Sequence, residues 1–235
     1  MRIEAIFFDI GDTLVTDSPT LDGRIRHACV DCALDIDPSR LTPALRRIED
    51  YALEAYVDGR TTDDPAVMLR TAERLLEEIG QDPGRAAAFV DAFAAQPFER
   101  VLHPSALPLI DTLKSHGFKI GVISDWDPGL LGLLEEWDLA PRLDAVAVSA
   151  IVGCTKPDPR LFHHALAQAN VDPSRALHVG DFYELDVAGA RAAGMHALLY
   201  DTRSRSTTAG CARVVTFEEL ADFLLALDPP LRTGA

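Results

Sequence analysis

Residues 3–14 read I-E-A-I-F-F-D-I-G-D-T-L, and this stretch decides how the rest of the chain is interpreted. Its apolar run ends at the carboxylate of Asp9, and Gly11 then permits a sharp turn. Such a run is too short to cross a membrane and is typical of a strand that is buried on both faces. Taken alone, Asp9 is read as the start of a turn. However, ligands of open α/β sheets bind outside the carboxyl ends of the strands, so we also expect a site here.

The composition excludes several classes of protein. The chain has 235 residues, of which 48% are hydrophobic, and this is enough for one or two domains with a real core. Its net charge of −15 repels nucleic acid and anionic lipid, so neither is an expected partner. The N-terminus has no signal-peptide pattern and no stretch is long enough to span a bilayer, so we expect a cytoplasmic protein.

The C-x-x-C formed by Cys29 and Cys32 has two interpretations. The spacing is found in redox and zinc sites. Both cysteines, however, fall on the apolar face of a predicted helix, and no second cysteine pair completes a tetrahedral zinc site. We therefore expect the two thiols to be small buried side chains.

Two patterns divide the chain. Residues 20–96 show only helical periodicity, about four helices, and the helix starts are marked by an acidic or hydroxyl residue followed by proline, as in Asp64-Pro65. After Pro97, helical segments alternate with short apolar runs at 119–123, 145–148, 176–179, 196–200 and 213–216. Two of these helices are expected to open at Asp127-Pro128 and Asp158-Pro159, and another is expected over 184–193. This alternation predicts an α/β fold with a parallel sheet and helices on both faces.

Three further groups follow these apolar runs or lie in a nearby loop. Ser124 can donate a hydrogen bond to an anionic oxygen, although it is nearly as easily a turn or capping serine. Lys156 lies in a loop, one of only three lysines, where surface charge is the usual interpretation. Asp181 and Asp186 flank a strand-to-helix turn, and with Asp9 they would offer the hard oxygen ligands that suit Mg²⁺. Alone, they would be ordinary acids at a helix N-terminus.

These four elements, in this order, resemble the haloacid dehalogenase superfamily in its phosphatase-like branch. The resemblance covers the whole chain and implies a Rossmann-like parallel sheet core with an inserted all-helical cap domain. The core would comprise residues 1–16 and 97–235, and the cap residues 17–96.

The resemblance also implies a role for each motif residue. Asp9 would be the nucleophile that forms an aspartyl-phosphate, which water then hydrolyses. A Mg²⁺ cofactor would be held by Asp9, the carbonyl of Gly11 and Asp181, with Asp186 in support. Ser124 and Lys156 would hold the phosphoryl oxygens of the substrate, and Asp125 would be a further substrate-binding residue.

One position departs from the family's phosphatases. They carry a second Asp two residues after the nucleophile, which protonates the leaving alcohol, and Gly11 stands there instead. Asp12, one place later, is the candidate substitute, although adjacent side chains of an extended chain diverge. The dehalogenases and phosphonatases of the family also lack this Asp, but the phosphonatases use a cap lysine, and residues 17–96 contain no lysine.

We therefore expect a Mg²⁺-dependent hydrolase of a small phosphorylated metabolite. Three alternatives stay open: a dehalogenase that works without metal, a mutase, and a catalytically weak regulatory protein that binds Mg²⁺ and phosphate. The sequence names neither the substrate nor the oligomeric state.

Overall fold

The computed structural model describes residues 2–230, except for 38, 42, 46, 49, 50, 52–63 and 203–209. The chain forms two compact units, each described here by itself. The core unit comprises Met1–Thr16 and Leu102–Ala235, and the helical unit comprises Asp17–Val101. No helix in the described part of the chain is both long and apolar enough to cross a membrane.

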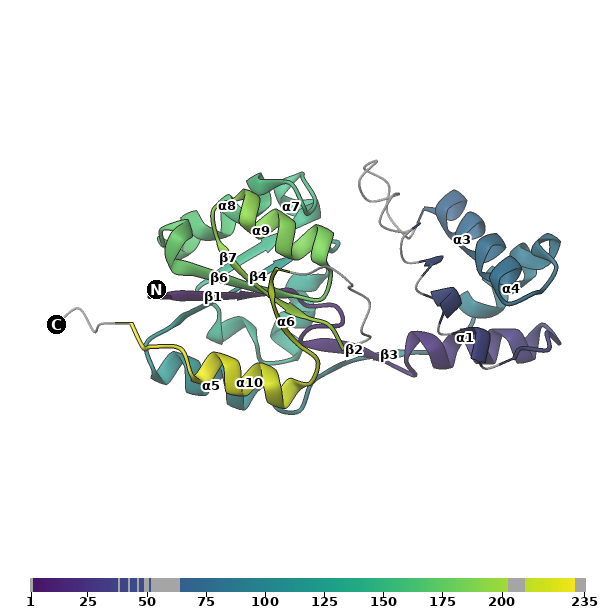
Figure 1. Cartoon of the computed structure of the whole chain (residues 1–235), viewed down its shortest axis with the longest axis horizontal. Helices are drawn as coiled ribbons and strands as arrows, with labels where there is room; N and C mark the ends of the chain where they lie inside the picture. Colours follow the sequence, from purple (N-terminus) through teal and green to yellow (C-terminus); the bar gives the residue numbers. More distant parts are fainter. Residues whose placement is uncertain are drawn as a thin grey trace. The chain divides into compact units, whose positions relative to one another are not determined.

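The core unit is built on a six-stranded parallel sheet with the strand order β5-β4-β1-β6-β7-β8 (Figure 1). This confirms the predicted fold class. Two of the predicted apolar runs match the observed strands fully, and two end one residue early. The run predicted at 213–216 begins one residue late and ends two residues late. The six strands are β1 (Ala5–Phe8), β4 (Lys119–Ser124), β5 (Ala145–Val148), β6 (Ala176–Gly180), β7 (His196–Tyr200) and β8 (Ala212–Val214).

Helices cover both faces of this sheet because successive side chains of β1 point to opposite sides. Ile6 and Phe8 are fully buried against α5, α6 and α10, whereas Ala5 and Phe7 are buried against α8 and α9. The two sets of helices lie on opposite sides of the sheet in Figure 1. The helices of this unit are α5 (Ala106–Ser115), α6 (Leu130–Glu136), α7 (Ser149–Val152), α8 (Pro159–Ala169), α9 (Ala188–Ala192) and α10 (Phe217–Leu225).

The register of the sheet brings the ends of three strands to one edge. Phe8 at the end of β1 pairs with Val122 of β4 on one side and with Val179 of β6 on the other. Because all three strands are parallel, the residues that follow these positions leave the sheet together. Asp9, Ser124 and Asp181 therefore emerge at the same edge.

Two helix starts differ from the sequence-based expectation. The helix expected from Asp127 begins at Leu130, because Asp127 Oδ1 accepts a hydrogen bond from the Gly129 N–H and holds a turn there. The helix expected over 184–193 begins as a π-helical turn, Tyr183–Val187, and continues as α9. Such π-helical turns are rare in proteins, and those that occur often lie at functional sites.

The helical unit contains α1 (Leu21–Asp31), α3 (Pro65–Glu78) and α4 (Ala86–Ala94). Asp64 caps α3 by accepting a hydrogen bond from the Ala66 N–H, as the Asp-Pro pattern predicts. Cys29 is buried in the core of this unit, as expected, whereas Cys32 is only partly buried against it, and both thiols are free. Pro38 and Thr42, which belong to the predicted helix starts Asp37-Pro38 and Thr42-Pro43, lie outside the described residues.

The sequence did not predict the short two-stranded sheet of β2 (Val15–Ser18) and β3 (Glu99–Leu102). Both are mostly exposed and mix polar with apolar residues, so neither carries the continuous apolar run of the core strands. Most of β3 belongs to the helical unit, so the core unit resumes at Leu102, whereas residue 97 was expected.

Candidate active site

The carboxylate of Asp9 is fixed where β1 ends. The Asp9 N–H donates to the carbonyl of Val179 over 2.8 Å, so β6 holds this residue in place. The next carbonyl, that of Ile10, accepts hydrogen bonds from the N–H groups of Leu14 and Val15 and closes a tight turn. Only 6% of Asp9 is exposed. The apolar strand thus delivers a nearly buried carboxylate to the edge of the sheet.

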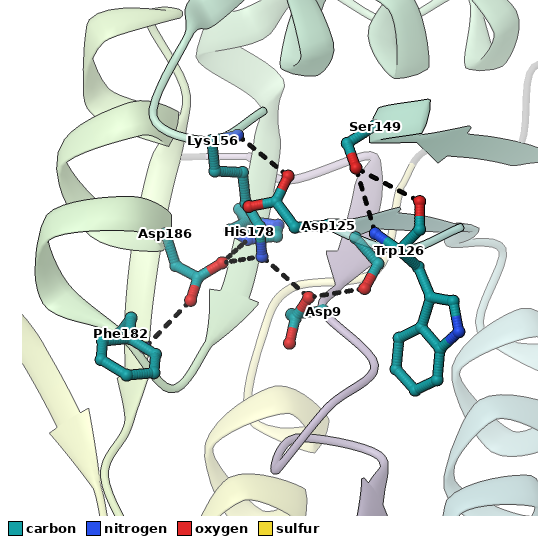
Figure 2. Close-up of polar contacts among 9 residues, drawn as sticks. Asp9, Asp125, Trp126, Ser149, Lys156, His178, Phe182 and Asp186 are labelled. Atoms are coloured by element: carbon teal, nitrogen blue, oxygen red, sulfur yellow. Dashed lines mark hydrogen bonds and ion pairs between the residues drawn. The ribbon is translucent and has the colours of Figure 1, made fainter. Parts of the chain in front are cut away.

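One oxygen of this carboxylate is held by two donors (Figure 2). Asp9 Oδ1 accepts a hydrogen bond from Ser124 Oγ at 3.0 Å and from Lys156 Nζ at 2.8 Å. Within the described part of the chain, Asp9 Oδ2 has no hydrogen-bond partner. The structure therefore brings together the three predicted residues and leaves one carboxylate oxygen for chemistry.

Lys156 is a buried cation, not the surface charge that a loop lysine usually is. It is 4% exposed, and its Nζ lies 2.7 Å from Asp186 Oδ1 in addition to its contact with Asp9. Burial alone would lower the pKa of Lys156, but the attraction of Asp186 and Asp9 outweighs it and raises the pKa well above its usual value. The ammonium group thus stays charged at every physiological pH.

Asp186 anchors this lysine. Its Oδ1 accepts hydrogen bonds from Lys156 Nζ and from the ring of His178 at 2.9 Å, and its Oδ2 accepts one from the Phe182 N–H at 2.9 Å. Burial would raise the pKa of Asp186, but Lys156 and His178 hold it below its usual value. A Cβ on Gly180 would lie 2.2 Å from Asp186 Cγ, so only glycine leaves room for this carboxylate.

His178 is the residue of this network that the sequence analysis missed. It is fully buried in β6 and its ring also lies edge-on to Phe162. The available signal was a polar residue inside an otherwise apolar strand, A-L-H-V-G, because a fully buried histidine needs a hydrogen-bond partner.

Asp125 holds the backbone of the lysine loop. Its Oδ1 accepts a hydrogen bond from the Lys156 N–H at 3.0 Å, whereas its Oδ2 is buried and has no partner among the described residues. Burial raises the pKa of Asp125 to about 6, and the nearby Asp9 and Asp186 carboxylates act in the same direction. Asp125 thus positions Lys156, and its contact with a substrate stays a prediction.

The turn after Asp9 distinguishes Gly11 from Asp12. Gly11 lies outside the left-handed region, whereas Asp12 has a φ of 52°. Asp is among the few residue types that tolerate this conformation. The chain is therefore not extended at Asp12, and strand alternation does not predict where its side chain points.

The donors at the strand ends fit a hard cation. Among the described residues, no three His, Cys, Asp or Glu side chains gather into a metal-binding group. Mg²⁺, however, usually takes only one or two carboxylates from a protein and completes its shell with water and substrate phosphates. Asp9 Oδ2 and the nearly buried Asp181, from adjacent strands, meet that requirement. Asp186 Oδ1 already accepts two hydrogen bonds, so only its Oδ2 retains a lone pair for a supporting role.

The comparisons with known proteins identify the family of the chain. The sequence pattern described as haloacid dehalogenase-like hydrolase matches residues 3–194. Haloacid dehalogenase-like hydrolase domain-containing protein 3 of Bos taurus is 38% identical, covering 85% of this chain and 82% of its own. Glyceraldehyde 3-phosphate phosphatase of Methanopyrus kandleri is 30% identical and covers 82% of both chains.

A solved structure shows the same fold. The HAD-hydrolase YfnB of Bacillus subtilis, described as bound to magnesium, aligns with a TM-score of 0.66 over 95% of this chain and 99% of its own. At 19% identity, this similarity concerns the fold alone.

Proposed function

Since the chain belongs to the haloacid dehalogenase-like hydrolases, we propose that it is a Mg²⁺-dependent phosphatase of a small phosphorylated metabolite. The observation that carries this proposal is the pair of unequal oxygens on Asp9. Oδ1 is held by Ser124 and Lys156, and Oδ2 has no hydrogen-bond partner in the described structure. The phosphatase named among the relatives supports the choice of a phosphate ester over a halide.

Asp9, Lys156 and Ser124 each have a separate role in this reaction. Asp9 Oδ2 attacks phosphorus, the bond from phosphorus to the leaving oxygen breaks, and water then hydrolyses the aspartyl-phosphate. Lys156 Nζ has three protons, two of which face Asp9 and Asp186, so the third is left for a phosphoryl oxygen. Ser124 Oγ has one proton, so it must turn from Asp9 to donate to the phosphoryl group.

Charge explains why a cation is needed. A carboxylate and a phosphate ester repel each other, and Lys156 is already shared between two carboxylates. Bound Mg²⁺ would neutralise this repulsion, with Asp9 and Asp181 as its protein carboxylates and the Gly11 carbonyl and Asp186 in support. The cap role of residues 17–96 stays a prediction.

The test is a screen of phosphorylated metabolites and 2-haloacids, with Mg²⁺ and with a chelator, that measures released phosphate and halide. We expect phosphate release that depends on Mg²⁺. Metal-independent halide release would establish the dehalogenase alternative. Binding of Mg²⁺ and phosphate without turnover would establish the regulatory one.

The matched control is Asp9→Asn. The amide keeps the shape of the side chain and one oxygen to accept from Lys156, but it cannot attack phosphorus. We expect turnover to be abolished while circular dichroism shows a folded protein. Activity near that of the wild type would contradict the covalent mechanism.

A further inference from the structure

Trp126 places an aromatic ring near Gly11, two residues after the nucleophile Asp9. It follows Ser124 and Asp125 at the end of β4, and its backbone N–H donates to Ser149 Oγ at 3.1 Å. Its carbonyl accepts a hydrogen bond from the same hydroxyl at 3.3 Å. The indole is partly exposed and packs against the larger hydrophobic cluster of the core unit. Ser149 thus holds the backbone of Trp126, and packing against this cluster holds the side chain.

The indole borders the space that a side chain at position 11 would fill. Among the described residues outside the adjoining chain, a Cβ built on Gly11 would have one neighbour within 4 Å, Trp126 Cζ3 at 3.8 Å. In Figure 2 the indole is drawn on one side of Asp9, and Asp186 is drawn on the other. An aromatic ring therefore borders position 11, whereas Lys156 and Asp186 form the charged pair that contacts Asp9 Oδ1 through Lys156 Nζ.

We propose that Trp126 selects phosphate esters whose leaving oxygen is bonded to an aromatic or other planar sp² carbon, that is, aryl or enol phosphates. This inference rests on the proposed phosphatase function. An apolar planar group can stack on the indole and gains a favourable contact. The hydroxyl groups of a sugar phosphate would instead lose water against it without finding a partner.

A second, independent feature leads to the same substrate class. Gly11 cannot donate a proton to the departing oxygen, so the leaving group must be stable as an anion. An oxygen on an sp² carbon meets that condition because the charge spreads into the π system. The absent acid and the present indole thus select the same chemistry, one through the electronic stability of the leaving group and the other through its shape.

The experiment separates the effect of contact with the Trp126 indole from the effect of leaving-group acidity. It compares kcat/KM for phenyl phosphate with that for a fluorinated alkyl phosphate whose alcohol has the same pKa as phenol. We expect the wild type to prefer phenyl phosphate by about 3- to 10-fold, the size of one aromatic contact. Trp126→Leu should reduce the ratio to about 1, and Trp126→Phe should retain most of it. An equal ratio in the wild type and Trp126→Leu would overturn the proposal.

A binding measurement decides the question without turnover. Calorimetry with Mg²⁺ present should show that the wild type binds phenylphosphonate more tightly than methylphosphonate, and that Trp126→Leu loses this difference. Loss of this difference with no turnover of any phosphate ester would refute the phosphatase function and keep the Trp126 surface. Turnover of phosphate esters by a wild type that binds phenylphosphonate and methylphosphonate equally would support the phosphatase function and refute the Trp126 proposal. If Trp126→Leu does not fold, Gly11→Ala fills the same space, and an unchanged phenyl preference in that variant refutes the proposal.

Discussion

Gly11→Asp should restore the acid that the leaving group lacks. The backbone accepts the change because Gly11 lies outside the left-handed region. In the described part of the chain the new Cβ meets only the indole of Trp126, at the ordinary contact distance of 3.8 Å. The new carboxyl group would join a site where Asp9, Asp125 and Asp186 surround one lysine. Their negative charge should raise its pKa and keep part of it protonated near neutral pH, as a general acid requires.

The size of the effect depends on the leaving group. A positioned general acid contributes about 10²–10⁴-fold, and since this site is not otherwise adapted to one, we expect about 10- to 100-fold for alkyl phosphates. Esters with acidic leaving groups need no proton, so their rates should change little. The assay is kcat/KM across a series of alkyl and aryl phosphates. The steep dependence on leaving-group pKa in the wild type should become shallow in the variant.

Two controls decide the cause. Gly11→Asn has nearly the same shape but transfers no proton, so it should keep the steep dependence. Asp12→Asn should leave the wild-type series unchanged. The reasoning would be refuted if the wild-type kcat/KM did not vary with leaving-group pKa and activity were lost in Asp12→Asn, because Asp12 would then be the acid. An unchanged alkyl rate in a folded Gly11→Asp variant would refute it as well.

Two other substitutions test the metal site and the buried acid. Asp181→Asn should weaken Mg²⁺ binding in calorimetric titrations more than Asp186→Asn does, because Asp181 would be the direct ligand; unchanged affinity in Asp181→Asn would rule out this placement. Asp125→Asn should raise the free energy of unfolding at pH 7.5 by up to about 3 kcal/mol, since burial raises the pKa of Asp125 to about 6 from an ordinary value of 3.8. Between these pH values the folded state binds more protons than the unfolded state, so the wild type loses stability as the pH rises through this window. Urea unfolding without divalent cations should therefore show a gain that shrinks below pH 4, and a gain independent of pH would contradict the assignment.

The sequence by itself determined most elements of the core unit and indicated most of the residues that gather at the candidate active site. Apolar runs predicted β5 and β7 with their observed bounds, and Asp-Pro pairs predicted the starts of α3 and α8. These features depend on local chemistry: the burial pattern of a few neighbouring side chains, a capping carboxylate and the fixed φ of proline. The resemblance of the motifs then indicated Asp9, Ser124 and Lys156 as partners.

Only the tertiary structure decided how these residues meet. Ser124 and Lys156 lie 115 and 147 positions from Asp9 in the sequence, and the parallel strand order brings them onto one oxygen of its carboxylate. The link from His178 to Asp186 and the approach of Trp126 to Gly11 depend on the same packing. No local pattern encodes such contacts, because they arise when separate strands are buried side by side. Burial also sets the charge state of the site, since it removes water from Lys156 and leaves its charge to be balanced by two carboxylates.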